Sequence, residues 1–141
     1  MILYITCCIE NMNLSVRLSG IPNAGSGLFT AEPINKGDLL VEYTGEWTTW
    51  NNVKADWENF YLYVVDDDHV INAKDHPESY ARYVNDAAGL FVVKGLSNNC
   101  EFIQIDGRVY IKAIRDILAG EEILVGYGSE YWDTIRKNNS R

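Results

Sequence analysis

Apolar residues in this chain come in short runs separated by polar breaks, and the helical period of 3.6 residues is weak almost everywhere. Short runs that alternate, or that are rich in β-branched and aromatic residues, are typical of strands. The ranges with this pattern are Ile2–Ile9, Leu14–Leu18, Leu28–Thr30, Asp38–Tyr43, Tyr61–Val65, Val70–Ala73, Cys100–Ile105, Arg108–Ala113 and Ile123–Tyr127. Many short strands with little helix favour a mainly β fold of the α+β type.

Turn residues indicate how these strands connect. Asp106-Gly107 separates two strand-like runs and is the strongest hairpin signal in the chain. A second hairpin is expected around Asp66–Asp68, and Ile2–Ile9 is expected to pair with Leu14–Leu18. Helices are expected only at Trp47–Glu58, Ser79–Val84 and Glu130–Lys137.

The length of 141 residues, with 47% apolar and 23% charged residues, predicts one globular domain. A membrane span is not expected, because no run of 18 apolar residues occurs. Three cysteines are too few for a disulfide framework, and the odd number indicates a reducing compartment. Without a C-x-x-C pair, no structural zinc or other metal site is expected.

The charge balance argues against one class of partner. Twelve basic and twenty acidic residues give a net charge of −8, whereas a nucleic-acid-binding domain should show the opposite balance. Such a domain attracts basic partners, for example a lysine-rich peptide. The alternative is that the acidity only keeps the protein in solution.

Three segments carry polar or backbone groups that could bind a ligand. Asn23–Phe29 contains a G-x-G without a third glycine and leads into a strand, which excludes a phosphate-binding loop and leaves either close backbone approach to a ligand or a plain turn. Tyr80–Asp86 offers the Asn85 amide, and Ala119–Gly128 places Tyr127 between two glycines. Each signal is weak alone, because a helix cap and an edge-strand tyrosine are common alternatives.

The order of the motifs is more specific than any one of them. The series Gly25-Ser26-Gly27-Leu28-Phe29, Glu42-Tyr43-Thr44-Gly45-Glu46, Arg82-Tyr83-Val84-Asn85, Asn99-Cys100 and Gly120-Glu121-Glu122-Ile123 with Tyr127-Gly128 resembles the SET-domain family. The resemblance extends from about Val16 to Trp132, so residues 1–141 are expected to form one SET domain.

This resemblance implies a SET fold of small curved β-sheets with a C-terminal pseudoknot, formed by the Asn85 segment and the Gly120–Gly128 segment. It also implies an S-adenosylmethionine-dependent protein-lysine N-methyltransferase. The expected substrate is a basic, lysine-containing protein such as a histone tail, with no direct role for nucleic acid or membrane. The site of action is then the nucleus, or a host nucleus, and otherwise the cytoplasm. Two alternatives remain: a catalytically silent protein-interaction module of the SET or PR type, and a methyltransferase of a non-histone protein.

The resemblance assigns roles to individual residues. It implies that Tyr127 and Tyr43 are catalytic and that Tyr43, Phe102 and Val125 line the lysine channel. The residues that it implies for the cofactor are Ala24, Gly25, Ser26, Gly27, Tyr61, Arg82, Tyr83, Asn85, Asp86 and Trp132. For Tyr43 and Trp132, plain core packing is an alternative.

The chemistry of lysine methylation agrees with these residue types. The amine must be neutral to attack a methyl group, yet its usual pKa is about 10.4, so deprotonation at pH 7 costs about 4.6 kcal/mol. An apolar, aromatic channel disfavours the charged ammonium and lowers this cost. A strong general base is then not required, and the Tyr127 hydroxyl is left with alignment of the reactants.

The chain departs from the family pattern at three points. Asp86 stands where the family commonly has histidine after the asparagine. The form Arg82-Tyr83-Val84-Asn85 is closer to the PR-domain subgroup, which contains weak and inactive members. The cysteine-rich segment that often follows the Tyr-Gly motif is absent, so Glu130–Arg141 is expected to complete the channel.

Overall fold

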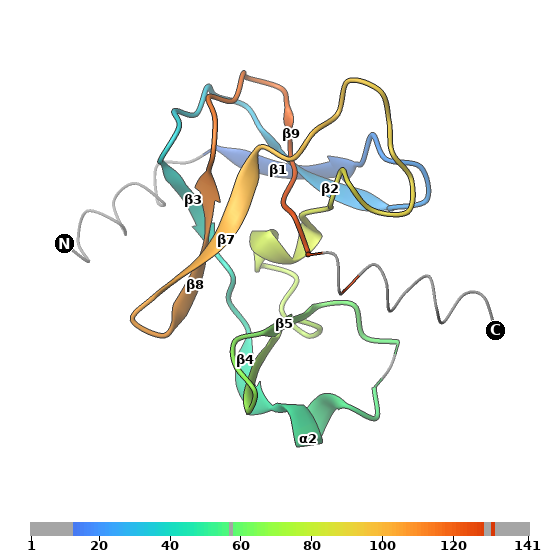
Figure 1. Cartoon of the computed structure of the whole chain (residues 1–141), viewed down its shortest axis with the longest axis vertical. Helices are drawn as coiled ribbons and strands as arrows, with labels where there is room; N and C mark the ends of the chain where they lie inside the picture. The colour runs from blue at the N-terminus through green and yellow to red at the C-terminus, as the bar shows by residue number, and fades with distance from the viewer. Residues whose placement is uncertain (1–12, 57, 129–130, 132–141) are drawn as a thin grey trace.

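The computed structural model describes residues 13–56, 58–128 and 131. In this part of the chain the secondary structure is almost entirely short strands (Figure 1). The strands are β1 (Leu14–Leu18), β2 (Ser26–Thr30), β3 (Leu39–Glu42), β4 (Glu46–Thr49), β5 (Leu62–Val64), β6 (His69–Asn72), β7 (Cys100–Ile105), β8 (Arg108–Ala113) and β9 (Glu122–Ile123). The helical elements are α2 (Trp50–Val53) and the 3-10 helix η1 (Tyr80–Tyr83).

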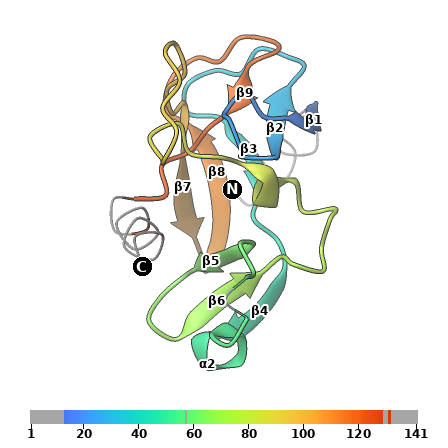
Figure 2. The same ribbon diagram turned by 90° about the vertical axis from the view of Figure 1, so that its right-hand side faces the viewer.

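The described strands form three small antiparallel sheets with the orders β1-β2-β9, β3-β8-β7 and β4-β6-β5. Figure 2 shows the third sheet, with α2, at the opposite end of the molecule from the first. The first sheet joins distant parts of the chain, because Leu28 of β2 pairs with Ile123 of β9. The prediction of a mainly β fold made of small sheets is confirmed.

Both hairpins predicted from turn residues are present. In the β7–β8 hairpin the strands end at Ile105 and begin again at Arg108, as predicted. Asp106 and Gly107 between them have φ values of 50° and 79°, which a two-residue hairpin turn of this type requires. The β5–β6 hairpin pairs Tyr63 with Ile71 around the acidic turn.

The helix predicted at Trp47–Glu58 is mostly wrong, because only Trp50–Val53 of the described residues in this range form α2. Trp47 and Thr48 belong to β4, where they pair with Ile71 and Val70 of β6. The strand conformation is favoured here because pairing in the sheet buries Thr48, whereas α2 buries only Val53. The segment Ser79–Val84 is helical as expected, but as one 3-10 turn.

The strand predicted at Ile123–Tyr127 is also too long. Only Ile123 lies in β9, and the next two residues form single bridges: Leu124 with Asn85 and Val125 with Cys100. Leu14–Leu18 pairs with β2, whereas the predicted partner Ile2–Ile9 lies outside the described residues. Most of the predicted helix Glu130–Lys137 lies outside them as well.

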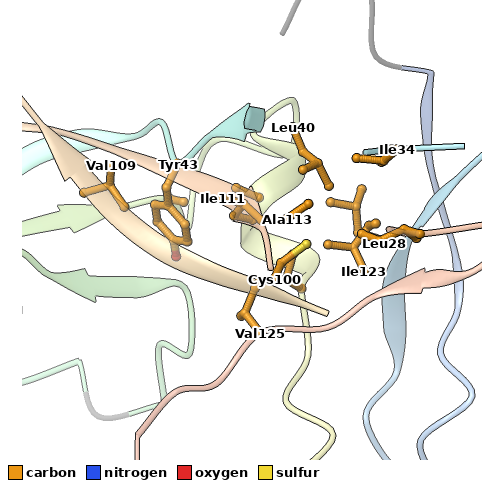
Figure 3. Packing of buried hydrophobic residues seen from close by; sticks show 14 of the residues in the cluster. Leu28, Ile34, Leu40, Tyr43, Cys100, Val109, Ile111, Ala113, Ile123 and Val125 are labelled. Carbon is orange, nitrogen blue, oxygen red and sulfur yellow. The ribbon is translucent and has the colours of Figure 1, made fainter. Parts of the chain in front are cut away.

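A core of buried side chains holds the sheets together and fixes the segment after β9 (Figure 3). Leu28 and Ile123 of the first sheet are fully buried against Leu40 and Ile111 of the second. Val125 is fully buried in the same cluster, so the stretch that leads to Tyr127 is anchored by packing. No helix in the described ranges is long and apolar enough to cross a membrane.

Candidate functional site

A cavity of about 520 Å³ lies where several segments that are distant in sequence meet. Its wall is made by the loop at 21–26, the segment 58–61, the segment 82–86, and single residues from elsewhere. It includes these predicted site residues: Ala24, Gly25, Ser26, Tyr61, Arg82, Tyr83, Asn85, Asp86 and Tyr127. Gly27 is not part of the wall, and Trp132 lies outside the described residues.

Asn85 joins three of the predicted motifs. Its side-chain Nδ2 donates a hydrogen bond of 2.9 Å to the carbonyl oxygen of Ser26 in the glycine loop. Its own backbone carbonyl accepts a hydrogen bond of 2.9 Å from the backbone N–H of Val125. The glycine loop, the end of η1 and the segment after β9 therefore meet at this residue.

Glu122 belongs to one of the predicted motifs, but the sequence did not indicate a role for it. In the structure it has a structural role. It is 7% exposed, and its carboxylate accepts hydrogen bonds from Ser19 Oγ at 2.6 Å and from the Gly20 N–H at 2.9 Å. A Cβ at Gly27 would lie 2.4 Å from Glu122 Oε2. Gly27 thus allows close packing against this carboxylate, and its predicted contact with a cofactor stays a prediction.

Tyr127 is held at both its ring and its backbone. Its hydroxyl donates a hydrogen bond to the carbonyl oxygen of Val84, and its N–H donates one of 2.8 Å to Asp86 Oδ2. Burial raises the pKa of the phenol above its ordinary value. Tyr127 is therefore a neutral hydrogen-bonding group at physiological pH and is not suited to act as a general base.

Asp86 is a buried acceptor that organises the surrounding backbone. Besides the Tyr127 N–H, it accepts hydrogen bonds of 2.8 Å from the Ala88 N–H and from Asn98 Nδ2. The carboxylate is 6% exposed, and hydrogen bonds from N–H donors compensate its burial. Asp86 thus fixes the backbone of Tyr127 at the position where the family pattern has histidine.

Arg82 connects the aromatic part of the wall. Its guanidinium lies 4.2 Å from the ring centroid of Tyr61 and 4.7 Å from that of Tyr83. It donates hydrogen bonds to the carbonyl oxygens of Ala73 and Lys74, and one of 2.7 Å to the Tyr83 hydroxyl. Its Nε is buried from solvent and finds no hydrogen-bond partner among the described residues.

Tyr43 and Phe102, predicted for the lysine channel, lie together in an aromatic cluster with Tyr63. The ring centroids are 5.7 Å apart for Tyr43 and Tyr63, 6.2 Å for Tyr43 and Phe102, and 4.9 Å for Tyr63 and Phe102. Burial raises the pKa of Tyr43 against a smaller lowering effect of Arg82. Val125, the third residue predicted for the channel, is buried in the hydrophobic core.

The two histidines lie outside the cavity wall. His69 Nδ1 is 2.9 Å from Asp66 Oδ1, and His76 Nδ1 is 2.9 Å from Glu78 Oε1. Across the described ranges, no group of three or more His, Cys, Asp or Glu side chains is arranged to hold a metal ion.

Comparison with known proteins places this arrangement in a family. The family model described as "SET domain" matches residues 25–128. The chain is 32% identical over 118 residues to a human histone-lysine N-methyltransferase that is H3 lysine-36 specific. It is 31% identical over 116 residues to an H3 lysine-4 specific enzyme of Neurospora crassa, and 29% identical over 132 residues to histone-lysine N-methyltransferase EZH2 of Chaetomium thermophilum.

These alignments cover most of this chain but little of the relatives. They include 75%, 74% and 84% of the chain, against 4%, 8% and 8% of the respective relatives. The range of the family model includes Gly25–Gly27, Asn85 and Tyr127. The chain belongs to the SET-domain family of protein-lysine methyltransferases.

Proposed function

We propose that this protein is an S-adenosylmethionine-dependent N-methyltransferase that acts on lysines of basic proteins, with histone tails in a nucleus as the first candidates. The observation that supports this most is the cavity in which the glycine loop, Tyr61, Asn85 and Tyr127 come together. These residues are brought from distant parts of the sequence to one wall, and they are the residues that the family resemblance names.

The cavity suits the cofactor in size and in chemistry. Its volume of about 520 Å³ is in the range of small-molecule sites. The Arg82 guanidinium in the wall is a cationic donor group suited to the carboxylate of an amino acid, and Ala24–Ser26 supply backbone groups to the same wall. When bound, S-adenosylmethionine supplies a methyl group on a positively charged sulfur. The residues proposed to hold it are Ala24, Gly25, Ser26, Tyr61, Arg82 and Asn85.

The aromatic cluster is proposed as a wall of the lysine channel. The rings of Tyr43, Tyr63 and Phe102 present mainly apolar surface, which disfavours an ammonium without a partner and lowers the pKa of an entering lysine. The neutral hydroxyl of Tyr127 then orients the amine by hydrogen bonding, and its contact with the Val84 carbonyl keeps the ring in place. Proton loss to solvent completes the preparation of the nucleophile without a dedicated base.

The charge of the protein supports a basic substrate. The net charge is −8, and the turn between β5 and β6 presents Asp66, Asp67 and Asp68 on the surface. Such a field attracts a lysine- and arginine-rich peptide and speeds its association. The names of the relatives, all histone-lysine methyltransferases, make histone tails the first substrates to test.

Asp86 bears on the alternative of a catalytically silent module. A residue that disturbed the Tyr127 backbone would favour that alternative, because catalysis depends on alignment. The Asp86 carboxylate instead accepts the Tyr127 N–H at 2.8 Å, so the departure from the family pattern is compatible with an aligned site.

The test is incubation of the protein with methyl-labelled S-adenosylmethionine and the four core histones. We expect label on a histone lysine. Label on another basic protein alone would support the non-histone alternative. Cofactor binding without transfer to any protein, or no binding at all, would contradict the proposal and favour the silent module.

A further inference from the structure

The segment from Asp86 to Asn98 forms a long loop between η1 and β7 that is tied at its base (yellow to gold in Figure 1). Asn98 Nδ2 donates to Asp86 Oδ1 at 2.8 Å, and the Ala87 N–H donates to Asn98 Oδ1 at 2.8 Å. Ala87 is 4% exposed, and it and Leu96 pack in a small apolar cluster with Ile21. The base of the loop is therefore fixed against the segment that carries the glycine loop.

The tip of this loop presents apolar side chains next to the cavity. Leu90 is 39% exposed and Phe91 is 45% exposed, and both line the cavity. Their neighbour Val92 is 74% exposed and does not line it. Two adjacent large apolar residues that remain accessible at a cavity wall indicate a surface that a ligand covers.

The cavity wall contains two chemically different kinds of residue. Arg82 and Asn85 supply hydrogen-bonding groups, and the Arg82 guanidinium lies over the rings of Tyr61 and Tyr83. Ile21, Leu90 and Phe91 add apolar surface to the wall, and the loop that carries Leu90 and Phe91 packs at its base on Ile21. A ligand with one charged end and one flat, weakly polar ring system has a partner for each kind of residue.

We propose that Leu90 and Phe91 form the surface that binds the adenine ring of the cofactor, so that this loop determines affinity and selectivity for the purine end. The inference rests on the proposed function, since it takes S-adenosylmethionine as the ligand. The charged amino-acid end then lies toward Arg82 and Asn85, and the purine is covered by the loop tip.

The test compares two ligands by calorimetry: S-adenosylhomocysteine, which has both ends, and 5′-methylthioadenosine, which lacks the amino-acid end. Leu90→Ser and Phe91→Ser should each weaken both ligands by the same factor, about tenfold for the loss of a buried apolar contact. Phe91→Tyr should retain the affinity because it keeps the ring. Val92→Ser is the matched control and should bind as the wild type does.

The possible outcomes distinguish a failure of the loop inference from a failure of the proposed function. If the wild type binds S-adenosylhomocysteine and both serine variants bind it equally well, the loop inference is wrong while the proposed function stands. Weaker binding of S-adenosylhomocysteine with unchanged 5′-methylthioadenosine would place the loop at the amino-acid end and overturn the inference too. No binding of S-adenosylhomocysteine by the wild type would overturn the proposed function and the inference together. Melting temperatures without ligand should agree among the variants, because both side chains are partly exposed in the free protein.

Discussion

At the scale of single residues, Gly27 and Glu122 depend on each other. The Glu122 carboxylate is held by Ser19 and Gly20 and is close to Asn85 Nδ2, at 3.4 Å. It can keep this place only because no side chain extends from Gly27, where a Cβ would lie 2.4 Å from its Oε2. The glycine in this loop therefore acts through packing of the protein itself.

This packing predicts the effect of Gly27→Ala. The methyl group must displace the hydrogen-bonded carboxylate, so the free energy of unfolding should fall by about 1–3 kcal/mol. Gly126→Ala is the control, because its Cβ would meet only Asn98 Nδ2 at 3.6 Å. Urea unfolding of both variants, and of Gly27→Ala combined with Glu122→Ala, measures the coupling. A loss for Gly27→Ala that is no smaller in the Glu122→Ala background would show that the two residues are independent.

The residues of the site differ in how well the sequence predicts them. Asn85 and Tyr127 were predicted as site residues because each is a polar group in a motif with a family resemblance, and both line the cavity. Glu122 gave no such signal, since a glutamate before a strand is usually exposed. Leu90 and Phe91 gave none either, because their position at the cavity depends on how the base of the loop is anchored across the fold.

At the scale of elements, Asp86 ties the η1 segment, the following loop and the Tyr127 backbone together. Its two carboxylate oxygens accept from Ala88, Asn98 and Tyr127. An amide in its place would turn a donor toward at least one of these N–H groups. Asp86→Asn should therefore lower the free energy of unfolding by about 1–3 kcal/mol, measured by urea titration.

The control for this variant is Asp75→Asn, where the aspartate is exposed on the surface. The midpoint of its urea unfolding should equal that of the wild type. If Asp86→Asn were as stable as Asp75→Asn, the proposed stabilisation of the Tyr127 segment by the Asp86 hydrogen bonds would be refuted.

Elements that local chemistry determines were predicted best. The β7–β8 hairpin matches the prediction to the residue, because Asp106-Gly107 satisfies the special backbone of its turn. Trp47–Thr49 was misassigned as helix, because its strand state depends on pairing with β6, some twenty residues away in sequence. The end of the strand after Ile123 was also missed, because Leu124 and Val125 bridge to two different segments where a regular strand would pair with one.

At the scale of the whole molecule, the core that joins the sheets contains the thiol of Cys100, which is 1% exposed. Burial raises the pKa of this thiol from 9.0 to about 12. Above pH 9 the unfolded chain loses the proton while the folded protein retains it. Because the unfolded state then binds fewer protons, the free energy of unfolding should fall with rising pH, by about 1 kcal/mol per pH unit from this group.

The measurement is urea unfolding of the reduced protein and of Cys100→Ala between pH 7 and pH 10. The alanine variant should be less stable by a constant amount below pH 9, and the difference should shrink above it. Ionisation of other groups occurs in both proteins and cancels in the comparison. A difference that stays constant up to pH 10 would show that the thiol does not contribute to the pH dependence.

The central claim, that this cavity aligns a lysine for methyl transfer, is tested most directly by Tyr127→Phe. The variant removes one hydroxyl, and mass spectrometry of a histone substrate incubated with S-adenosylmethionine measures turnover, while calorimetry with S-adenosylhomocysteine measures cofactor affinity. Turnover should fall by about a hundredfold or more with little change in affinity, because the hydroxyl acts on alignment of the reacting groups. Methylation by the variant at the wild-type rate would contradict the account.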